Sequence, residues 1–473
     1  MKVWSHPWLI AIPLLVSCGQ ESAANHRPVI LISIDSLRAD HCTPYGYQGE
    51  LSGAATTPWM QSLAESGATF EQCSAAAPWT LPSHISMLTG MHPMEHGVRA
   101  RRFRLPANTE NIAGKFKNAG YKTAAFYSAP FLHPSWGYYP GFDTYVGAAP
   151  YLNTEEATDA MMNTAAPGIR KFHDAADTDK ENAPHVVDKA LAWLEKDNRK
   201  NQPFFLFLHF WDPHYNYQAP DDYNRMFLPD FTEADRKLGK EFTPRLPQEY
   251  SAHDIGRIKA MYDAEIRYTD DQLARLFVKL HEWGLENEVI VAVVSDHGDH
   301  FGEHGQYFHH RTLYQEVIHV PMVVRASGLI EPNTRSSASV SIYDIGPTLL
   351  DLVGLSAWPE RSGRSALPLL KEGNHEVMMD LLHPGQKLDL RGWRQGMEKA
   401  VWDTRGGTFG IWDLAKDPSE MAPNWISDPE QTATSAAASE AFRQADLAPG
   451  VASPMTEDSE MKRRLAELGY IDG

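Results

Sequence analysis

Short apolar runs alternate along this chain with segments in which apolar residues recur at helical spacing. Near-continuous apolar runs bounded by turn residues predict buried strands, and these are residues 28–35, 122–127, 204–210, 289–295 and 320–325. Helical spacing predicts amphipathic helices at residues 58–67, 183–196, 260–283 and 343–355. Such alternation predicts an α/β fold, in which helices flank a mostly parallel central sheet.

The pattern changes after residue 375. Residues 399–403 and 407–413 predict two antiparallel strands that are joined at Gly406-Gly407. Residues 430–450 are rich in Ala, Ser and Thr, so we expect a surface loop or linker there. The chain is therefore predicted to have a main domain over residues 28–375 and a smaller C-terminal α+β subdomain with a tail over residues 376–473.

The N-terminus has the pattern of a secretory signal. Lys2 precedes an apolar stretch, residues 8–16, that is too short to span a bilayer comfortably. The stretch ends in Leu-Val-Ser-Cys18, which resembles a bacterial lipobox; an ordinary signal peptide with a nearby Cys is the alternative. We expect residues 1–17 to be a lipoprotein signal peptide, Cys18 the lipidation site and residues 18–27 a polar tether.

This N-terminus also predicts where the protein resides. Gly19 follows the Cys, and Asp at that position would be needed to favour retention at the inner membrane. No later run of 18 apolar residues exists, so membrane contact is expected only through the lipid anchor. The expected location is the bacterial cell envelope, at the outer membrane and facing the periplasm or the surface.

Composition narrows the functional class. The 473 residues carry 43 Lys and Arg against 61 Asp and Glu, a net charge of −18, which argues against a general nucleic-acid binder. Three Cys exclude a disulfide framework and a Cys-rich zinc module. Cys42 and Cys73 could pair in an oxidising compartment or remain free buried thiols.

Side chains of the kinds that bind metals follow three of the predicted strands. They are Asp35, His209, Asp212, His214, Asp296 and His297. Sites in open parallel sheets form at the carboxyl ends of strands, so we expect these residues to meet at one edge. Carboxylate and imidazole together suit a divalent cation such as Mg, Mn, Ca or Zn. A single Asp at a strand end could merely cap a helix, but three strands together predict a metal site.

A hydroxyl nucleophile is expected near the same edge. Thr80 lies just before a helical apolar pattern that includes Ile85 and Leu88. A hydroxyl at a helix N-terminus beside a metal is readily deprotonated, and the amides there suit a tetrahedral oxyanion. The spacing is equally consistent with Thr80 merely capping the helix.

Taken with these motifs, the chain resembles the sulfatase family of the alkaline phosphatase superfamily over roughly residues 28–420. The matching stretches include ISIDSLRADH, TLPSHISMLTGMHP, FLFLHFWDPHYNY, VVSDHGDHFGEHG, HHRTLYQEVIHVPMVV and DIGPTLLDLVGL. The resemblance implies a sulfatase-like catalytic domain, a large α/β sandwich, followed by a smaller C-terminal domain. It also implies a metal-dependent esterase that passes through a covalent intermediate on its nucleophile.

Departures from the family pattern concern the nucleophile. The family signature is Cys-x-Pro-Ser-Arg, whose Cys or Ser is converted to formylglycine, whereas this chain has Thr80 at the first position and His84 at the last. A Thr cannot yield that aldehyde, so no formylglycine is expected. A Thr ester must be hydrolysed at S or P, which sulfate esters resist more than metal-bound phosphates do. The pattern resembles the Thr-nucleophile branch of the superfamily, which contains phosphatases, phosphodiesterases and head-group phosphotransferases.

The resemblance assigns a metal site. It implies that Asp35, Asp296 and His297 bind one divalent metal, either Ca, Mn, Zn or Mg, with Thr80 Oγ as a further ligand. A second metal on Asp212, His214 and His309 is open, because single-metal relatives also carry an Asp-Pro-His motif.

The resemblance also assigns roles toward the substrate. It implies that Thr80 attacks P or S, and that His214 contacts substrate oxygens or protonates the leaving group. His84 and His310 would take over anion binding from the Arg and Lys of the family pattern.

The expected function is therefore metal-dependent hydrolysis of sulfate or phosphate esters through a covalent Thr80 intermediate, with phosphate mono- or diesters favoured. The substrate is expected to be a small anionic ester, with a sugar or aryl group as one option and no nucleic acid as partner. Two alternatives are a phospho-head-group transferase of the same superfamily and a catalytically inactive binding protein. The intact set of Asp35, Thr80, Asp296 and His297 argues against the second.

Overall fold

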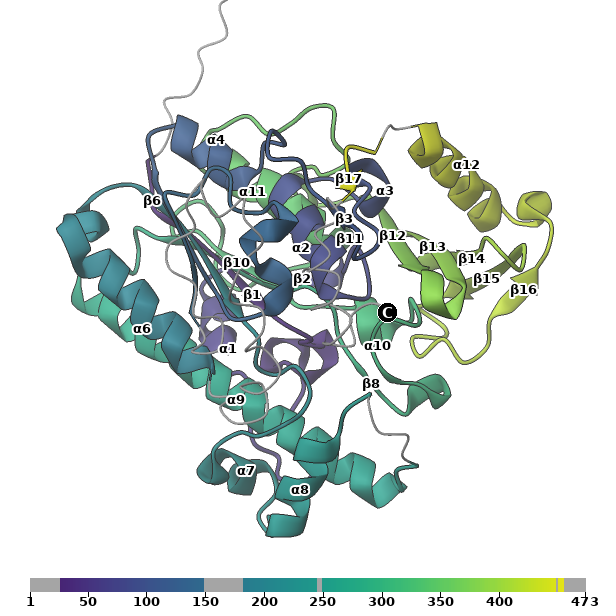
Figure 1. Ribbon diagram of the computed structural model, residues 1–473, viewed down its shortest axis with the longest axis horizontal. Helices are drawn as coiled ribbons and strands as arrows, with labels where there is room; N and C mark the ends of the chain where they lie inside the picture. The colour runs from purple at the N-terminus through teal and green to yellow at the C-terminus, as the bar shows by residue number, and fades with distance from the viewer. Residues whose placement is uncertain (1–25, 149–181, 245–248, 448–449, 455–473) are drawn as a thin grey trace, which may run out of the picture.

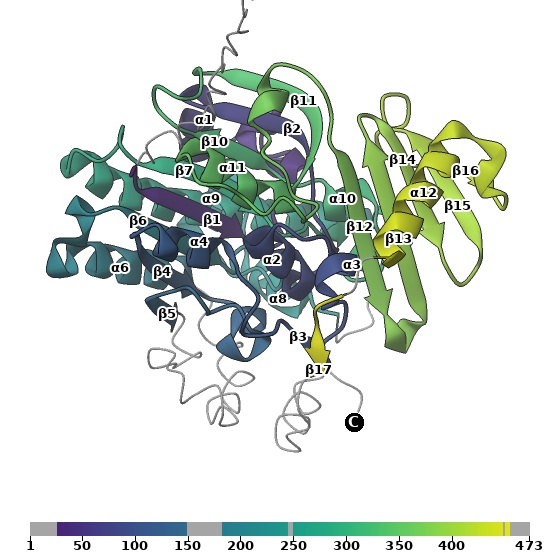
Figure 2. The same ribbon diagram turned by 90° about the horizontal axis from the view of Figure 1, so that it is seen from above.

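The computed structural model describes residues 26–148, 182–244, 249–447 and 450–454. A large sheet with helices on both faces forms the main body, and a smaller antiparallel sheet stands beside it (Figures 1 and 2). The expected signal peptide, Cys18 and most of the tether lie outside the described residues and stay predictions. In the described part of the chain, no helix has both the length and the apolar character needed to cross a membrane.

The main sheet has eight strands in the order β11-β2-β10-β7-β1-β6-β4-β5. Their bounds are β1 Val29–Ile34, β2 Ala68–Ser74, β4 Lys122–Tyr127, β5 Thr144–Gly147, β6 Phe204–Phe210, β7 Ile290–Ser295, β10 Met322–Arg325 and β11 Thr334–Ser341. Only β10 runs antiparallel to its neighbours in this sheet. The mostly parallel sheet expected from the sequence is confirmed.

Two cores cover the two faces of this sheet, and β1 contributes to both. Val29 and Leu31 belong to one core, whereas Ile30 and Ile32 belong to the other, as the strand period of two requires. The first core includes side chains from α2 Thr80–Thr89, α4 Ile112–Asn118 and α11 Ile345–Leu352; the second includes side chains from α1 Pro58–Glu65, α6 Asn182–Glu195, α7 Asp221–Phe227 and α9 Ala252–Glu282. The remaining helices of the main body are α3 Pro93–His96, α8 Glu233–Glu241 and α10 Gln315–Ile318.

The second sheet is antiparallel throughout, and Figure 2 shows it at one side of the main body. Its strands are β12 Glu376–His383, β13 Leu388–Gln395, β14 Glu398–Asp403, β15 Thr408–Asp413 and β16 Asn424–Ile426. The hairpin expected around Gly406-Gly407 is confirmed as β14 and β15, which pair from Asp403 opposite Thr408 onwards. Gly407 has a φ of 69°, a left-handed conformation that a glycine adopts at little cost. The described residues also form two short pairs of strands, which are β3 Phe103–Arg104 with β17 Ser453–Pro454 and β8 His300–Phe301 with β9 Tyr307–Phe308.

The expectation of a surface loop at residues 430–450 is wrong, because Ala433–Leu447 forms helix α12. Alanine has the highest helix propensity, and the Thr432 hydroxyl accepts a hydrogen bond from the Ser435 amide at the start of the helix. Ala438, Phe442 and Ala445 recur at helical spacing and pack with apolar side chains of the second sheet. The helix is therefore stabilised by the sheet that it covers.

The two alternatives for Cys42 and Cys73 are also decided. Both thiols are free and buried. Cys42 Sγ donates to the Arg38 carbonyl oxygen at 3.3 Å. They are therefore part of the packed interior.

A buried ion pair joins the second sheet to the main body. Lys399 on β14 has no exposed surface, and its Nζ lies 2.6 Å from a Glu420 carboxylate oxygen and 2.6 Å from the Leu313 carbonyl oxygen. The other Glu420 oxygen accepts a hydrogen bond from the Gln315 amide at 2.7 Å. The pair thereby fixes the segment that leads into α10.

Because this pair is buried, removing one charge leaves the other without compensation. We expect Glu420→Gln to lower the free energy of unfolding by about 3 kcal/mol, as for other broken buried pairs. Urea unfolding followed by tryptophan fluorescence measures it. The control is Asp413→Asn, which removes an exposed pair with Lys416 and should leave the unfolding midpoint unchanged. Equal midpoints for the two variants would contradict a stabilising role of the buried pair.

Candidate active site

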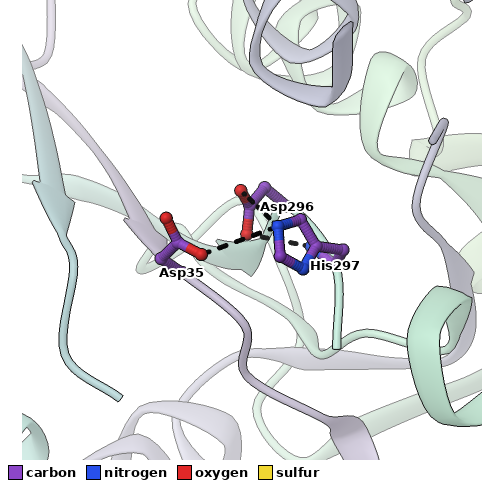
Figure 3. A group of neighbouring side chains, drawn as sticks. All are labelled: Asp35, Asp296 and His297. Carbon is purple, nitrogen blue, oxygen red and sulfur yellow. Dashed lines mark hydrogen bonds and ion pairs between the residues drawn. The ribbon is translucent and has the colours of Figure 1, made fainter. Parts of the chain in front are cut away.

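The register of three central strands determines where the predicted ligands lie. Ile34 at the end of β1 is level with Phe210 of β6 and with Ser295 of β7. The residues that follow β1 and β7 therefore emerge at the same edge, and Figure 3 shows Asp35, Asp296 and His297 turned toward one another. His297 Nε2 lies 3.6 Å from Asp35 and 3.4 Å from Asp296. One donor atom from each residue falls within 4.8 Å of the others.

The chemistry of Asp35, Asp296 and His297, which we name the metal group, fits a divalent cation. All three side chains are fully buried, and one carboxylate oxygen each of Asp35 and Asp296 has no hydrogen-bond partner. Burial raises the pKa of Asp35 to about 7, and burial and the neighbouring Asp35 raise the pKa of Asp296. A bound cation would keep the two desolvated carboxylates ionised and would be bound by a neutral nitrogen of the imidazole.

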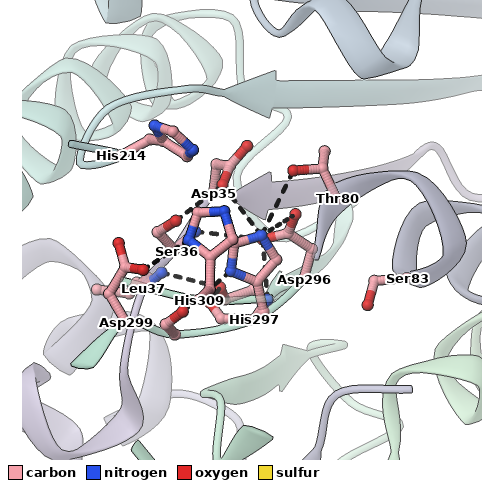
Figure 4. A network of polar contacts seen from close by, with 12 residues as sticks. Asp35, Ser36, Leu37, Thr80, Ser83, His214, Asp296, His297, Asp299 and His309 are labelled. Atoms are coloured by element: carbon pink, nitrogen blue, oxygen red, sulfur yellow. Dashed lines mark hydrogen bonds and ion pairs between the residues drawn. The ribbon is translucent and has the colours of Figure 1, made fainter. Parts of the chain in front are cut away.

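Thr80 is directed at the same group and does not cap its helix. It is the first residue of α2, while the N-cap position belongs to Trp79, whose backbone is extended and whose side chain caps nothing. Thr80 Oγ1 lies 3.4 Å from His297 Nε2, the contact that Figure 4 marks. The capping alternative is therefore not what the geometry shows, and the hydroxyl lies beside the side chains of the metal group.

The His84 ring lies between β1 and the start of α2. Its Nε2 lies 2.9 Å from the Ser33 hydroxyl, and its Nδ1 lies 2.9 Å from the Thr80 carbonyl oxygen. The ring is fully buried, and burial lowers its pKa to about 3. His84 thus connects β1 to the backbone of Thr80, and its Nδ1 also lies 3.4 Å from an Asp296 carboxylate oxygen. Its expected role in anion binding stays a prediction.

Three further imidazole rings lie in a group with His297. The His309 ring lies 4.3 Å from that of His297 and 5.1 Å from that of His214, between centroids (Figure 4). His310 stacks on His309 at 4.3 Å. Burial lowers the pKa of both His309 and His310 well below the usual value, so both rings are neutral near pH 7. The structure thus brings together His297, which the sequence predicted as a metal ligand, His214 and His310, which it predicted for the substrate side, and His309, which it predicted for a second metal; their roles stay predictions.

The residues expected for a second metal do not all converge. His214 and His309 are neighbours, but the Asp212 carboxylate accepts a hydrogen bond from the Ala183 amide at the start of α6, at 2.9 Å. Among the described residues, Asp212 does not join a group of three metal-binding side chains. The interpretation of Asp212 as a residue that organises local structure fits this contact better.

One residue of the site was missed from the sequence. Asp299 is fully buried, its carboxylate lies 2.6 Å from His309 Nδ1, and burial raises its pKa to about 8. It lies two positions after His297 in the motif SDHGDHFGEHG, and its presence in that motif was the available signal. The carboxylate fixes the orientation of the His309 ring, whose other nitrogen is then available to the site.

Comparisons with known proteins agree with this geometry. The sulfatase family model matches residues 27–355. The chain is 25% identical over 450 residues to the arylsulfatase of Clostridium perfringens, which covers 85% of this chain and 90% of that protein. It is also 25% identical over 424 residues to the iduronate 2-sulfatase of Homo sapiens, with 74% of each chain covered.

Solved structures share the fold. The phosphonate monoester hydrolase of Agrobacterium radiobacter superimposes with a TM-score of 0.67 at 21% identity, covering 89% of this chain and 95% of that chain. A structure solved in complex with its substrate D-glucosamine-2-N,6-O-disulfate also has a TM-score of 0.67, at 20% identity and with 93% and 98% covered. The family match spans the whole main sheet and its metal group, so this chain belongs to the sulfatase family and is a hydrolase that acts on ester bonds.

Proposed function

We propose that the protein hydrolyses phosphate or sulfate esters through a covalent ester on Thr80, with phosphate mono- or diesters favoured. A divalent cation held by Asp35, Asp296 and His297 would assist. The observation that carries the proposal is the position of Thr80 Oγ1, 3.4 Å from His297 Nε2 at the first residue of α2. A hydroxyl beside three metal-binding side chains and a helix N-terminus is activated as a nucleophile and directed at an anionic ester.

The mechanism follows from the surrounding side chains. A cation bound to the three residues would lower the pKa of the Thr80 hydroxyl and neutralise charge on the ester oxygens. Thr80 Oγ attacks P or S in line, the bond to the leaving oxygen breaks, and water later cleaves the bond between Thr80 Oγ and P or S. His84 holds the Thr80 carbonyl and so positions the start of α2. His214 lies beside His309, which lies beside His297, and either ring could pass a proton to the leaving oxygen.

The choice of phosphate over sulfate rests on residue 80. Formylglycine allows a sulfatase to release sulfate by cleavage of its own C–O bond, and a Thr cannot form it. The relatives point to possible leaving groups: two are named for the sugar derivatives iduronate and glucosamine disulfate, and one for phosphonate monoesters. A sugar-linked anionic ester is the substrate class that we propose.

Replacement of the nucleophile tests the covalent mechanism. We expect Thr80→Ala to lower kcat by roughly a thousandfold or more, whereas Thr80→Ser retains part of the activity because it keeps the hydroxyl. Steady-state kinetics on an aryl phosphate measures this. Thr89→Val is the matched control, since the Thr89 hydroxyl only donates to the Ile85 carbonyl within the same helix. Unchanged turnover in Thr80→Ala would exclude Thr80 as the nucleophile.

Removal of metal tests the proposed cation site. Dialysis against a chelator should abolish turnover and lower Tm, because the buried carboxylates of Asp35 and Asp296 then lose their counter-charge. Re-addition of Ca, Mn, Zn or Mg one at a time, followed by differential scanning fluorimetry and activity assays, identifies the metal. Asp296→Asn should lose the metal-dependent rise in Tm, and Asp188→Asn on the exposed face of α6 should keep it. A Tm independent of metal in the unaltered protein would count against the site.

Comparison of esters tests the preference. We expect kcat/KM for 4-nitrophenyl phosphate or its phosphodiester to exceed that for 4-nitrophenyl sulfate by about tenfold or more, which corresponds to a modest difference in transition-state binding. Mass spectrometry of the tryptic peptide that contains residue 80 should show an unmodified Thr. Cleavage of sulfate esters alone would show that the argument from formylglycine is wrong.

A further inference from the structure

A groove lies at the edge of the main sheet that is opposite to the metal group. Arg325, the last residue of β10, pairs with Val291 near the start of β7, whereas the metal group follows the ends of β1 and β7. The groove has a volume of about 670 Å³, which is in the range of sites for small ligands. Its lining comes from α1, α9, the loop before β7 and the connection from β10 to β11. The described lining residues are Trp59, Ser62, Leu63, Ser66, Ala274, Phe277, Val278, His281, Glu286, Asn287, Arg325, Ser327, Gly328, Ile330 and Pro332.

One part of the groove has a firm apolar wall. The Trp59 and Phe277 rings pack with their centroids 4.7 Å apart, and Leu63 continues the wall along α1. Asp270 of α9 accepts a hydrogen bond from the Trp59 amide at 2.7 Å, so the two helices that form the wall are fixed to each other (Figure 1). Val278 also lines the groove and is 57% exposed, so this part is open to solvent. An open apolar wall of this kind suits a hydrocarbon chain.

The other part of the groove contains an incompletely paired arginine. Arg325 is only 7% exposed. Its Nη2 donates to the Glu286 carbonyl oxygen, but its Nε is buried and has no partner among the described residues. A methyl group added at Gly67, just after α1, would lie 3.1 Å from Arg325 Cβ, so this arginine is at the far end of α1 from Trp59. A buried guanidinium with an unused N–H is costly unless an oxyanion compensates its charge.

A second arginine adds positive charge beside the first. Arg27 donates from all three guanidinium nitrogens to main-chain carbonyl oxygens, which belong to Asn287, Glu288 and Ser327. Asn287 and Ser327 line the groove, so Arg27 lies at its margin. Carbonyl oxygens satisfy the N–H groups of Arg27 without neutralising its charge. Two guanidinium groups therefore lie at the same end of the groove.

Few negative charges oppose these two arginines. Among the described residues that line the groove, Glu286 is the only acid, and its carboxylate oxygen lies 2.5 Å from His281 Nδ1. Burial lowers the pKa of Arg325; Glu286 acts against this shift, whereas Arg27 adds to it. Positive charge therefore exceeds negative charge at this end, in a protein whose net charge is −18. A ligand with one anionic group is complementary to it.

The chain enters the main body beside this groove. Arg27 lies two residues before β1, and the predicted lipidation site Cys18 lies nine residues before Arg27. Nine residues span at most about 30 Å when fully extended. A lipid anchor at Cys18 would therefore keep this face of the main body close to a bilayer, where phospholipids are the abundant amphiphiles.

We propose that the groove binds an anionic phospholipid, with the head group at Arg27 and Arg325 and one acyl chain along Trp59 and Phe277. The site lies at the edge of the sheet away from the metal group and does not depend on the hydrolysis proposed above. The lipid is bound and not altered there. Charge complementarity selects the head group, and the apolar wall accepts the chain.

Quenching of tryptophan fluorescence tests the site. The probes are lysophosphatidylglycerol and lysophosphatidylcholine below their micelle concentrations, each with a nitroxide on the acyl chain; only the first has a net negative charge. We expect saturable quenching by lysophosphatidylglycerol that is smaller in Trp59→Phe. Arg325→Gln should raise the Kd of lysophosphatidylglycerol by about tenfold or more and leave that of lysophosphatidylcholine nearly unchanged. The control is Arg335→Gln, which removes an exposed arginine paired with Glu71 and should change neither Kd.

A second variant leaves both arginines intact. Val278→Glu places a charge on the exposed rim, in the path of the acyl chain, and should weaken binding of both lysolipids by about tenfold. The matched control is Val451→Glu, since Val451 is a 41% exposed valine outside the groove, and it should change neither Kd. Equal Kd values for the two lysolipids in the unaltered protein overturn the proposal. So does a Kd of lysophosphatidylglycerol that neither Arg325→Gln nor Val278→Glu changes.

Two further measurements identify the occupant. Nitroxide-labelled stearate carries a carboxylate on the same kind of chain, and quenching by stearate without quenching by lysophosphatidylglycerol overturns a phospholipid as the ligand. Cys18→Ser removes the predicted acylation site. Quenching by lysophosphatidylglycerol that appears only in Cys18→Ser shows that the acyl group of residue 18 fills the groove, which also overturns the proposal. Equal quenching with and without Cys18→Ser supports an exchangeable phospholipid.

Discussion

The burial of two carboxylates side by side is the constraint on which the rest of the structure depends. Asp35 and Asp296 lie at the ends of adjacent parallel strands and have no exposed surface. One oxygen of each carboxylate has no hydrogen-bond partner. Such a pair is costly unless positive charge is supplied. No Lys or Arg lies in the group itself. The nearest imidazoles are those of His84 and His297, each 3.4 Å from Asp296, and of His209, 3.5 Å from Asp35. The fold therefore preserves an arrangement of donor atoms that suits a divalent cation.

The surrounding elements hold that arrangement from several directions. Ser33 on β1 and the Thr80 carbonyl on α2 contact the two nitrogens of His84, so the sheet and the helix are joined beside Thr80. From the other side, Lys399 and Glu420 of the C-terminal region hold residues 313 and 315. These follow His309 and His310 closely in sequence. The second sheet thus contributes to the site without supplying any residue to it.

The sequence predicted features whose evidence lies in neighbouring residues, and it did not predict features that depend on tertiary contacts. Buried apolar runs and the rule for parallel sheets predicted the ends of β1 and β7 and the convergence of Asp35, Asp296 and His297. The spacing around Thr80 was equally consistent with a helix cap, and only the family resemblance favoured Thr80 as a nucleophile. The contacts of His84 were not predicted, because its partners Ser33 and Thr80 are assembled only by tertiary packing. Helix α12 was missed because its composition is typical of a linker, and the helix is stabilised by packing of Phe442 against the second sheet.

The two buried thiols have a consequence for where this fold can form. Cys42 and Cys73 lie in the packed interior, each without a disulfide partner. Burial raises the pKa of both thiols well above the usual value, which keeps them protonated and unreactive toward oxidants. The main body consequently requires no oxidation step to reach its native state. Through these two residues, the folding of the main body is therefore independent of the redox state of its surroundings.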